Sequence, residues 1–569
     1  MGTMAWIRLQ AIKKDGEGKI IAGSASIVDT VYDPNGKYHS KQITREVLGR
    51  PLELASDRKS GIFRTPEGAI VAYDSNSDTK EVLDMDDPRL EGLIQSVRPN
   101  VHTVFGDAYL FLNYLKNIGM TDILREVFPA EDDFQRCVAH LFHTNMRNAS
   151  KDRCDLFLKK SFAGYVVPKV MNTSLVADTR YFDLMGDDEV RMSVFKGFVN
   201  LMRSSNPDFG RCCYIDSTPL PNDIDDNPFN AFSSHGDSGI QCRLILVADI
   251  GTGLPVWFKV IPGNVVDVNT LKNTADDVCI SLGITIVEHV LDAGYASEDL
   301  IRQYSLGVAC KATIRIDSKG NPVESVVIND DPELDDAEIP DKTMVVKMPF
   351  RAGYGHMDMF FSIKDLLNNG KYDFIREKHA YFGKRREVCL FGQRMYAYIY
   401  VDHNNALKGY RDFMSSHLDD FKDMKDKERT WKKYSSGFFV LLSNIREGPE
   451  EMLDRYFGRC FIESVFKTAK EYLDLLPLKK WTMQRVYGKL LSDMLSLIVY
   501  LNMRKEIMST RYSLTEVITT TQALMCCVDS NDAVHIDPPS KQVKDIYKVF
   551  GIKLQNQFDL GQYIDEFMS

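Results

Sequence analysis

The chain has 569 residues, of which 44% are hydrophobic and 26% charged, and its formal net charge is −10 at pH 7. This composition is typical of a globular protein of several domains, and without a run of about 18 apolar residues we expect no membrane-spanning helix. The negative net charge argues mildly against a nucleic-acid-binding protein, but the distribution of charge along the chain is more informative on this point. The eleven cysteines include no CxxC pair, and the first residues lack the apolar core of a signal peptide. We therefore expect a cytoplasmic protein with reduced cysteines, no zinc site and no membrane contact.

The first two segments differ in their hydrophobic period. Residues 1–95 contain β-branched runs around the turn signal Pro34-Asn35-Gly36, which predicts a β-rich module. This module could contact DNA or a partner, or it could only pack against the rest of the chain. Residues 96–208 have apolar residues at helical spacing and predict a helical domain, which could hold DNA or support a core.

From residue 209 the pattern predicts an α/β domain. Three apolar strands are followed by a helix near 268–283, a strand, a short helix capped by Ser297, and a fifth strand near 308–316. Asp216 and Asp292 each follow an apolar strand, and the carboxyl ends of strands are where α/β sheets place their sites. Either aspartate could instead be an ordinary turn residue.

Residues 316–445 read as a β-rich insertion that begins with the acidic, solvated stretch 329–341. Trp431 lies among cations near its end, where it could stack on a displaced base or pack at a domain seam. After 473, Lys479 and Lys480 precede a long apolar helix, and they could meet phosphates or simply be solvated.

Residues 455–473 are predicted to form one helix. At about 100° per residue, Tyr456, Arg459, Lys467 and Lys470 share a narrow stripe with Glu463, and apolar residues occupy the opposite side. The stripe could be a salt-bridged surface. It could also add a third carboxylate to Asp216 and Asp292, and such a set of oxygens is what hard divalent cations prefer.

A short motif in this helix points to a known family. It has the spacing Tyr-x2-Arg-x3-Glu-x6-Lys at Tyr456, Arg459, Glu463 and Lys470. This resembles the signature of a large group of bacterial insertion-sequence DDE transposases, known as YREK, whose catalytic core is ribonuclease H-like. The DST at 216–218, the PGN at 262–264 and the DAGYAS that begins at Asp292 also resemble catalytic regions of that family.

The resemblance implies an α/β fold with a ribonuclease H-like core. That core is a mixed five-stranded sheet with helices, interrupted by a β-rich insertion domain and preceded by a β module and a helical domain. The expected segments are the β module 1–95, the helical, DNA-binding domain 96–208, the first part of the core 209–315, the insertion 316–445, the second part of the core 446–508 and a helical C-terminal region 509–569.

The resemblance also implies a function. The protein would be a transposase that binds the ends of its insertion sequence and catalyses magnesium-dependent DNA strand cleavage and strand transfer in the bacterial cytoplasm. Asp216, Asp292 and Glu463 would bind two Mg²⁺ ions, for which Mn²⁺ substitutes. Its partners would be the terminal inverted repeats of its element and target DNA, with a homodimer or higher oligomer forming on DNA. The expected DNA contacts are Tyr456, Arg459, Lys467, Lys470, Trp431, Lys479 and Lys480.

Two other functions remain open at this point. The chain could be a metal-dependent DNA nuclease of the same fold that does not transpose. It could also be an inactive DNA-binding derivative, although three intact carboxylates argue against that.

Overall fold

The computed structural model divides the chain into two compact units. The first unit consists of Met1–Thr103, Met525–Pro538 and Gln555–Glu566, and the second of Val104–Leu524, Pro539–Leu554 and Phe567–Ser569. The structure describes residues 4–14, 20–34, 40–55, 57–65, 69–83, 87–90, 102–146, 154–170, 178–222, 224, 227–232, 239–265, 270–305, 315–316, 322–324, 341–348, 373–417, 424–473, 475–476, 478–529 and 531–568. This division is coarser than the six expected segments, whose boundaries stay predictions.

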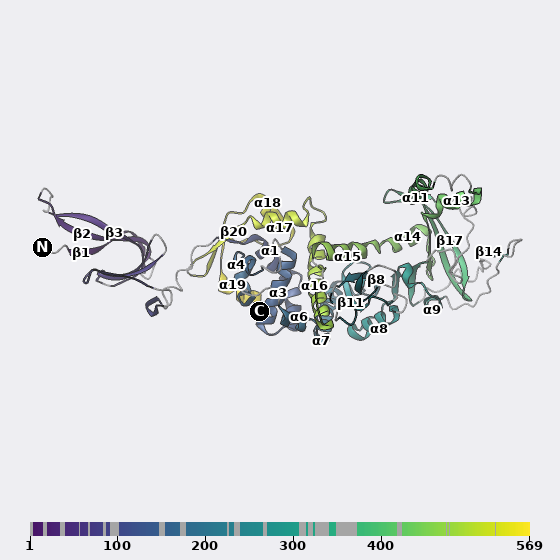
Figure 1. The fold of residues 1–569 in the computed structure, drawn as a ribbon, viewed down its shortest axis with the longest axis horizontal. Coiled ribbons are helices and arrows are strands. Elements are labelled where there is room, and N and C mark those ends of the chain that lie inside the picture. The colour runs from purple at the N-terminus through teal and green to yellow at the C-terminus, as the bar shows by residue number, and fades with distance from the viewer. Residues whose placement is uncertain are drawn as a thin grey trace. The chain divides into compact units, whose positions relative to one another are not determined.

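The first unit is built on an antiparallel sheet whose strands follow chain order (Figure 1). The strands are β1 (Met4–Lys14), β2 (Ile20–Tyr32), β3 (Ser40–Leu54), β4 (Ser60–Arg64), β5 (Ile70–Asp74) and β6 (Thr79–Val82), followed by the 3-10 helix η1 (Pro88–Leu90). Ile27, Leu48 and Phe63 are buried in its core. These strands lie in the segment for which the sequence predicted a β-rich module. Asn35 and Gly36 of the turn signal lie outside the described residues.

The C-terminal segment, expected to be helical, also contains strands. β20 (Met525–Val528), β21 (Ala533–Ile536) and β22 (Gln557–Asp559) form antiparallel pairs within the first unit. The helices here are α17 (Leu514–Gln522), α18 (Lys541–Val549) and α19 (Leu560–Met568). The sequence did not reveal these strands because a strand of three or four residues is too short to display a period.

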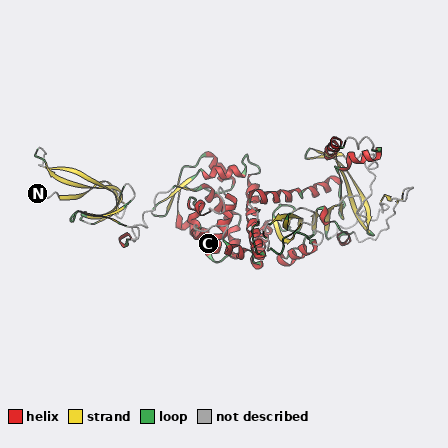
Figure 2. Cartoon of the chain, in the orientation of Figure 1, coloured by secondary structure: helices red, strands yellow, loops and turns green. Residues whose placement is uncertain are grey.

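The helical part of the second unit surrounds one long helix, α16 (Met483–Ile507), which Figure 2 shows with shorter helices beside it. Those before it in the chain are α1 (Gly106–Asn117), α2 (Met120–Val127), α3 (Glu131–Met146), α4 (Cys154–Lys159), α5 (Ala163–Val166), η3 (Pro168–Val170), α6 (Thr179–Met185) and α7 (Asp188–Ser205), with the short strand β7 (Thr103–Val104) ahead of α1. Asp178 and Asp187 accept backbone hydrogen bonds at the starts of α6 and α7. Tyr181 donates to Ser492 across 3.1 Å, which fixes α6 against α16.

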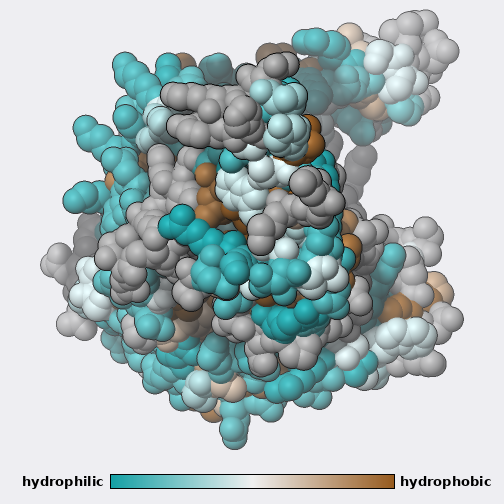
Figure 3. All heavy atoms as spheres, turned by 90° about the vertical axis from the view of Figure 1, so that its left-hand side faces the viewer, coloured by the Kyte–Doolittle hydropathy of each residue, from teal (hydrophilic) through white to brown (hydrophobic). Residues whose placement is uncertain are grey.

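One face of the molecule is largely polar among its described residues (Figure 3). Figure 3 shows a face on which hydrophilic side chains predominate and hydrophobic ones form small separate areas. Within the described ranges, no helix combines the length and the apolar character that crossing a bilayer needs.

A mixed sheet forms the other part of the second unit. Its strand order is β11-β10-β8-β12-β15-β19-β18-β17-β16, with β9 paired to β10. The strands are β8 (Cys212–Pro221), β9 (Ala231–Phe232), β10 (Ile240–Asp249), β11 (Pro255–Pro262), β12 (Glu288–Leu291), β15 (Thr343–Lys347), β16 (Asp373–Arg376), β17 (His379–Leu390), β18 (Gln393–Asp402) and β19 (Phe438–Ser443). β8, β10 and β11 are antiparallel neighbours, whereas β8, β12 and β15 run parallel. The helices of this part are α8 (Leu271–Leu282), η5 (Ala293–Tyr295), α9 (Glu298–Gln303), α11 (His403–Ser416), α13 (Asp426–Ser435), α14 (Pro449–Phe457) and α15 (Cys460–Tyr472).

The segment predicted as the fifth strand lies largely outside the described residues. Of residues 308–316, the structure describes Arg315–Ile316, which form β13 and pair with β14 (Pro322–Glu324). The parallel neighbour of β12 is β15, a segment that the sequence had assigned to the insertion. Both stretches are apolar and β-branched, so their composition could not decide between them. Because β15 also pairs with β19, one sheet continues from the core into the segment predicted as the insertion.

The single helix predicted for 455–473 is also wrong, because it is interrupted at Gly458 and Arg459. The Arg459 N–H donates to the Tyr456 carbonyl at 3.0 Å, a tighter turn than that of the α-helix. A Cβ atom on Gly458 would lie 1.8 Å from the Tyr214 hydroxyl oxygen of β8. The glycine therefore lets α14 and α15 meet directly over β8.

We expect Gly458→Ala to lower the free energy of unfolding by about 1–3 kcal/mol, because the added methyl group overlaps Tyr214. Tyr214→Phe should restore part of this loss, because it removes the atom in closest overlap. Chemical denaturation followed by circular dichroism measures both effects. Gly561→Ala on α19 is the control, since the nearest atom to its added Cβ is 3.3 Å away. An unchanged midpoint for Gly458→Ala would show that the close approach imposes no constraint.

Candidate active site

Three carboxylates converge from three elements of the second unit. Strands β8 and β12 are parallel and place Ile215 opposite Leu291, so the residues that follow, Asp216 and Asp292, are neighbours. Asp292 follows the last residue of β12, as predicted. Asp216 lies within β8, which continues to Pro221, so the prediction that this strand ends there is wrong. Glu463 lies in the first turn of α15.

The guanidinium of Arg459 lies between these carboxylates. Its Nη1 is 3.0 Å from Asp216 Oδ2, and its Nη2 is 2.8 Å from Glu463 Oε1 and 3.5 Å from Asp292 Oδ1. Tyr456 lies beside it, with its hydroxyl 3.4 Å from Asp292 Oδ1 and its ring centre 5.6 Å from the Arg459 guanidinium carbon. Tyr456 and Arg459 are both buried. The N-terminal end of the polar stripe expected from the helical wheel therefore faces the protein interior.

Exposure increases across the site. The side chain of Asp216 is 14% exposed, that of Asp292 41% and that of Glu463 55%. The pKa of Asp216 is raised to about 6, mainly by burial. Arg459 and the Ser217 N–H lower this pKa, and the negative charges of Asp292 and Glu463 contribute to raising it. The site thus has a less exposed end at Asp216 and an open end at Glu463, and the Arg459 guanidinium supplies the positive charge between them.

The residue types at this site suit a divalent ion, but the present arrangement of their side chains does not. Carboxylate oxygens are the ligands that Mg²⁺ prefers, at about 2.1 Å from the ion. Among the described residues, no group of three or more His, Cys, Asp or Glu side chains is arranged to hold a metal. The three carboxylates instead contact the two terminal nitrogens of one guanidinium. They could share an ion only after Arg459 had turned away.

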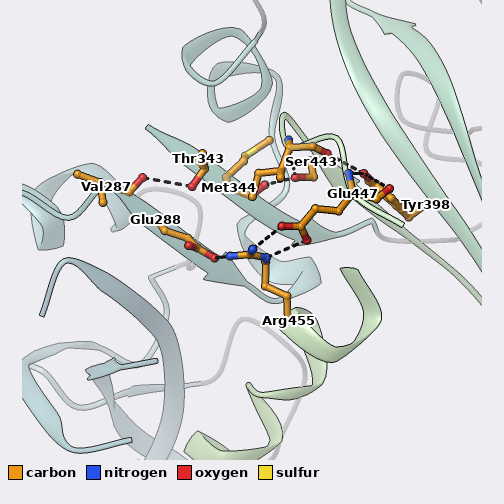
Figure 4. A network of polar contacts seen from close by, with 9 residues as sticks. Val287, Glu288, Thr343, Met344, Tyr398, Ser443, Glu447 and Arg455 are labelled. Atoms are coloured by element: carbon orange, nitrogen blue, oxygen red, sulfur yellow. Dashed lines mark hydrogen bonds and ion pairs between the residues drawn. The ribbon is translucent and has the colours of Figure 1, made fainter. Parts of the chain in front are cut away.

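Arg455, one turn before Arg459, holds α14 in place. Figure 4 shows its side chain between Glu288, which begins β12, and Glu447, which precedes α14. The shortest contacts are 2.6 Å to Glu288 and 2.5 Å to Glu447, and the Glu447 N–H donates to the Tyr398 hydroxyl of β18 at 2.8 Å. No motif in the sequence marked these residues, and the position of Arg455 next to Tyr456 was the one available hint.

Further contacts join α14 to the outer strands. The Tyr400 hydroxyl on β18 donates to the Pro449 carbonyl at 2.6 Å, and Arg376 on β16 reaches Asp454 at 2.5 Å. Contacts with β12, β16 and β18 therefore set the direction of α14, and with it the position of Tyr456.

The remaining predicted DNA contacts lie in different places. Lys470 donates to the Thr218 hydroxyl at 2.7 Å and to the Pro219 carbonyl at 3.2 Å, which ties α15 to the end of β8. Lys467 is exposed on α15, and Lys479 is exposed before α16. The Lys480 ammonium lies 3.8 Å from the ring centre of Phe182 on α6. Trp431 belongs to α13, and its side chain lies outside what the structure describes. DNA binding by these residues stays a prediction.

Comparison with known proteins shows only distant structural likeness. No family model and no curated protein matches the sequence. Among solved structures, a cryo-EM structure of the piggyBac transposase synaptic complex with hairpin DNA is similar over 81% of this chain and 84% of that chain. The sequence identity is 10% and the TM-score 0.33, so the likeness carries no argument about this chain.

We expect Arg455→Lys to lower the free energy of unfolding by about 1–3 kcal/mol, because an ammonium cannot bridge two carboxylates as a planar fork does. In a double-mutant cycle, Glu447→Gln should cost less in the Arg455→Lys background than in the wild type, by about 0.5 kcal/mol or more. Chemical denaturation measures both quantities. Arg302→Lys, which affects the half-exposed pair of Arg302 and Glu298, is the control and should change stability little. Strictly additive losses would mean that Arg455 does not link these elements.

Proposed function

We propose that the protein is a DDE transposase that cleaves and joins DNA strands at the ends of its own mobile element. The observation that carries the proposal is the convergence of Asp216, Asp292 and Glu463 around one cationic group. Carboxylates from two neighbouring parallel strands and one helix are the kind of ligand set that two-metal phosphoryl transfer uses.

The order of the core elements supports a ribonuclease H-like assignment within this proposal. Three antiparallel strands, a helix, a strand, a helix and a further parallel strand follow one another from β8 to β15. That is the order expected for the core from the sequence, with the last strand located later in the chain. The insertion would then be the strands and helices between β15 and β19.

Each residue of the site has a specific task in this proposal. Asp216, Asp292 and Glu463 would hold Mg²⁺, which supplies charge neutralisation at the phosphate and activation of the attacking water or 3′-hydroxyl. Tyr456 limits the motion of Asp292 through its hydroxyl. Lys470, at the far end of α15, would present a positive charge to the DNA backbone next to Thr218.

The decisive experiment uses the DNA that flanks the coding region. A duplex that carries its inverted repeats should be cut at the element end by the full-length protein in Mg²⁺ and joined to a target duplex. Asp216→Asn, Asp292→Asn and Glu463→Gln should each reduce cutting about a thousandfold or more while end binding persists, because each change removes an anionic ligand with little change in volume.

Glu298→Gln is the matched control, since this exposed carboxylate on α9 faces Arg302 rather than the site. Cutting without joining would reassign the protein as a nuclease. A triad variant that cuts at the wild-type rate would remove its residue from the proposed site, and a wild-type protein that cuts no flanking DNA would refute the function.

A further inference from the structure

Arg459 occupies the space that a shared metal ion needs. Its two terminal nitrogens contact all three carboxylates, Asp216 through Nη1 and the other two through Nη2. It also lies beside the ring of Tyr456, which provides an electron-rich wall for the guanidinium. The carboxylate partners of Arg459 are therefore the complete candidate ligand set.

A divalent cation and the guanidinium cannot both fit there. An ion shared by the three residues would have to lie about 2.1 Å from an oxygen of each. The same carboxylates now contact Arg459 at 2.8–3.5 Å, so such an ion would fall within contact distance of the guanidinium. Like charges this close repel strongly in a site that is partly shielded from water.

The two ends of the site differ in exposure, and this difference indicates where a divalent ion would enter. Arg459 is 8% exposed and the side chain of Asp216 is 14% exposed, whereas that of Glu463 is more than half exposed. An incoming ion therefore meets Glu463 and Asp292 first. Their contacts with Nη2 are the ones that an ion would replace before it reaches Asp216.

We propose that Arg459 acts as a built-in cation that keeps the metal-free site neutralised and must be displaced when a divalent ion binds. The inference rests on the proposed function for the identity of the ion, Mg²⁺ or Mn²⁺. It assigns to Arg459 a role beyond contact with DNA, because its contacts in the absence of metal lower the affinity of the site for metal. Arg459 is thus a positioning residue whose release accompanies assembly of the active site.

The test is Mn²⁺ binding by the full-length protein without DNA, measured by calorimetry and by the electron paramagnetic resonance signal of free Mn²⁺. Arg459→Met removes the guanidinium and keeps an unbranched side chain of similar reach. We expect it to bind Mn²⁺ about tenfold more tightly than the wild type, or better, because no cation has to be expelled. Adding Glu463→Gln to this variant should cancel the gain.

Two further variants protect the test against a folding defect. Arg459→Lys offers one ammonium in place of two nitrogens, so its affinity should fall between those of the wild type and Arg459→Met. Arg136→Met on α3 removes an arginine that contacts Asp178 at 2.6 Å, away from the candidate site, and should leave Mn²⁺ affinity unchanged. In thermal melts, Arg459→Met should gain more from added Mn²⁺ than the wild type gains, since the ion then restores a missing charge.

The outcomes separate this inference from the proposed function. Equal or weaker Mn²⁺ binding by Arg459→Met would overturn the inference, because Arg459 would then assist the metal or ignore it. Tighter binding by Arg459→Met, in a protein that cuts no flanking DNA, would uphold the displacement and refute the transposase function alone.

Discussion

The site depends on the cost of bringing three negative charges together at the surface of a sheet. Burial already disfavours the charged form of Asp216, and two more carboxylates increase that cost. Arg459 offsets it through one planar group that reaches all three. The fold makes this contact possible by interrupting the helix at Gly458, which lets the start of α15 lie directly over β8.

A second arginine fixes the frame in which the first one acts. Arg455 connects Glu288 at the start of β12 with Glu447 ahead of α14, and Tyr398 orients the backbone at Glu447. Arg455 and Arg459 are one turn apart and face different partners. Arg455 sets the position of α14 on the sheet, and Arg459 sets the charge of the site. We therefore expect a substitution of Arg455 to alter the contacts of Arg459.

The sequence predicted the carboxylates better than it predicted their surroundings. Asp216 and Asp292 each follow an apolar run in the sequence, and the helical wheel placed Arg459 on the side of Glu463, so their proximity could be inferred. A wheel gives the direction of a side chain but not what lies opposite, and so it did not reveal that Arg459 faces β8 and β12. The link between Glu288, Arg455 and Glu447 joins positions that no local pattern relates. The parallel neighbour of β12 is β15, which the sequence had assigned to the insertion, because β propensity alone does not reveal which strands pair across a sheet.

The continuity of the sheet has a mechanical consequence. β15 pairs with β19, and β19 with β18, so backbone hydrogen bonds run without a seam from the strand beside β12 to the outer hairpin of β17 and β18. The same hairpin is bonded to α14 through Tyr400. The hairpin of β17 and β18 is therefore connected to the carboxylates in two ways. One connection runs through the paired strands of the sheet, and the other runs through α14. The connection through α14 leads most directly to Arg459.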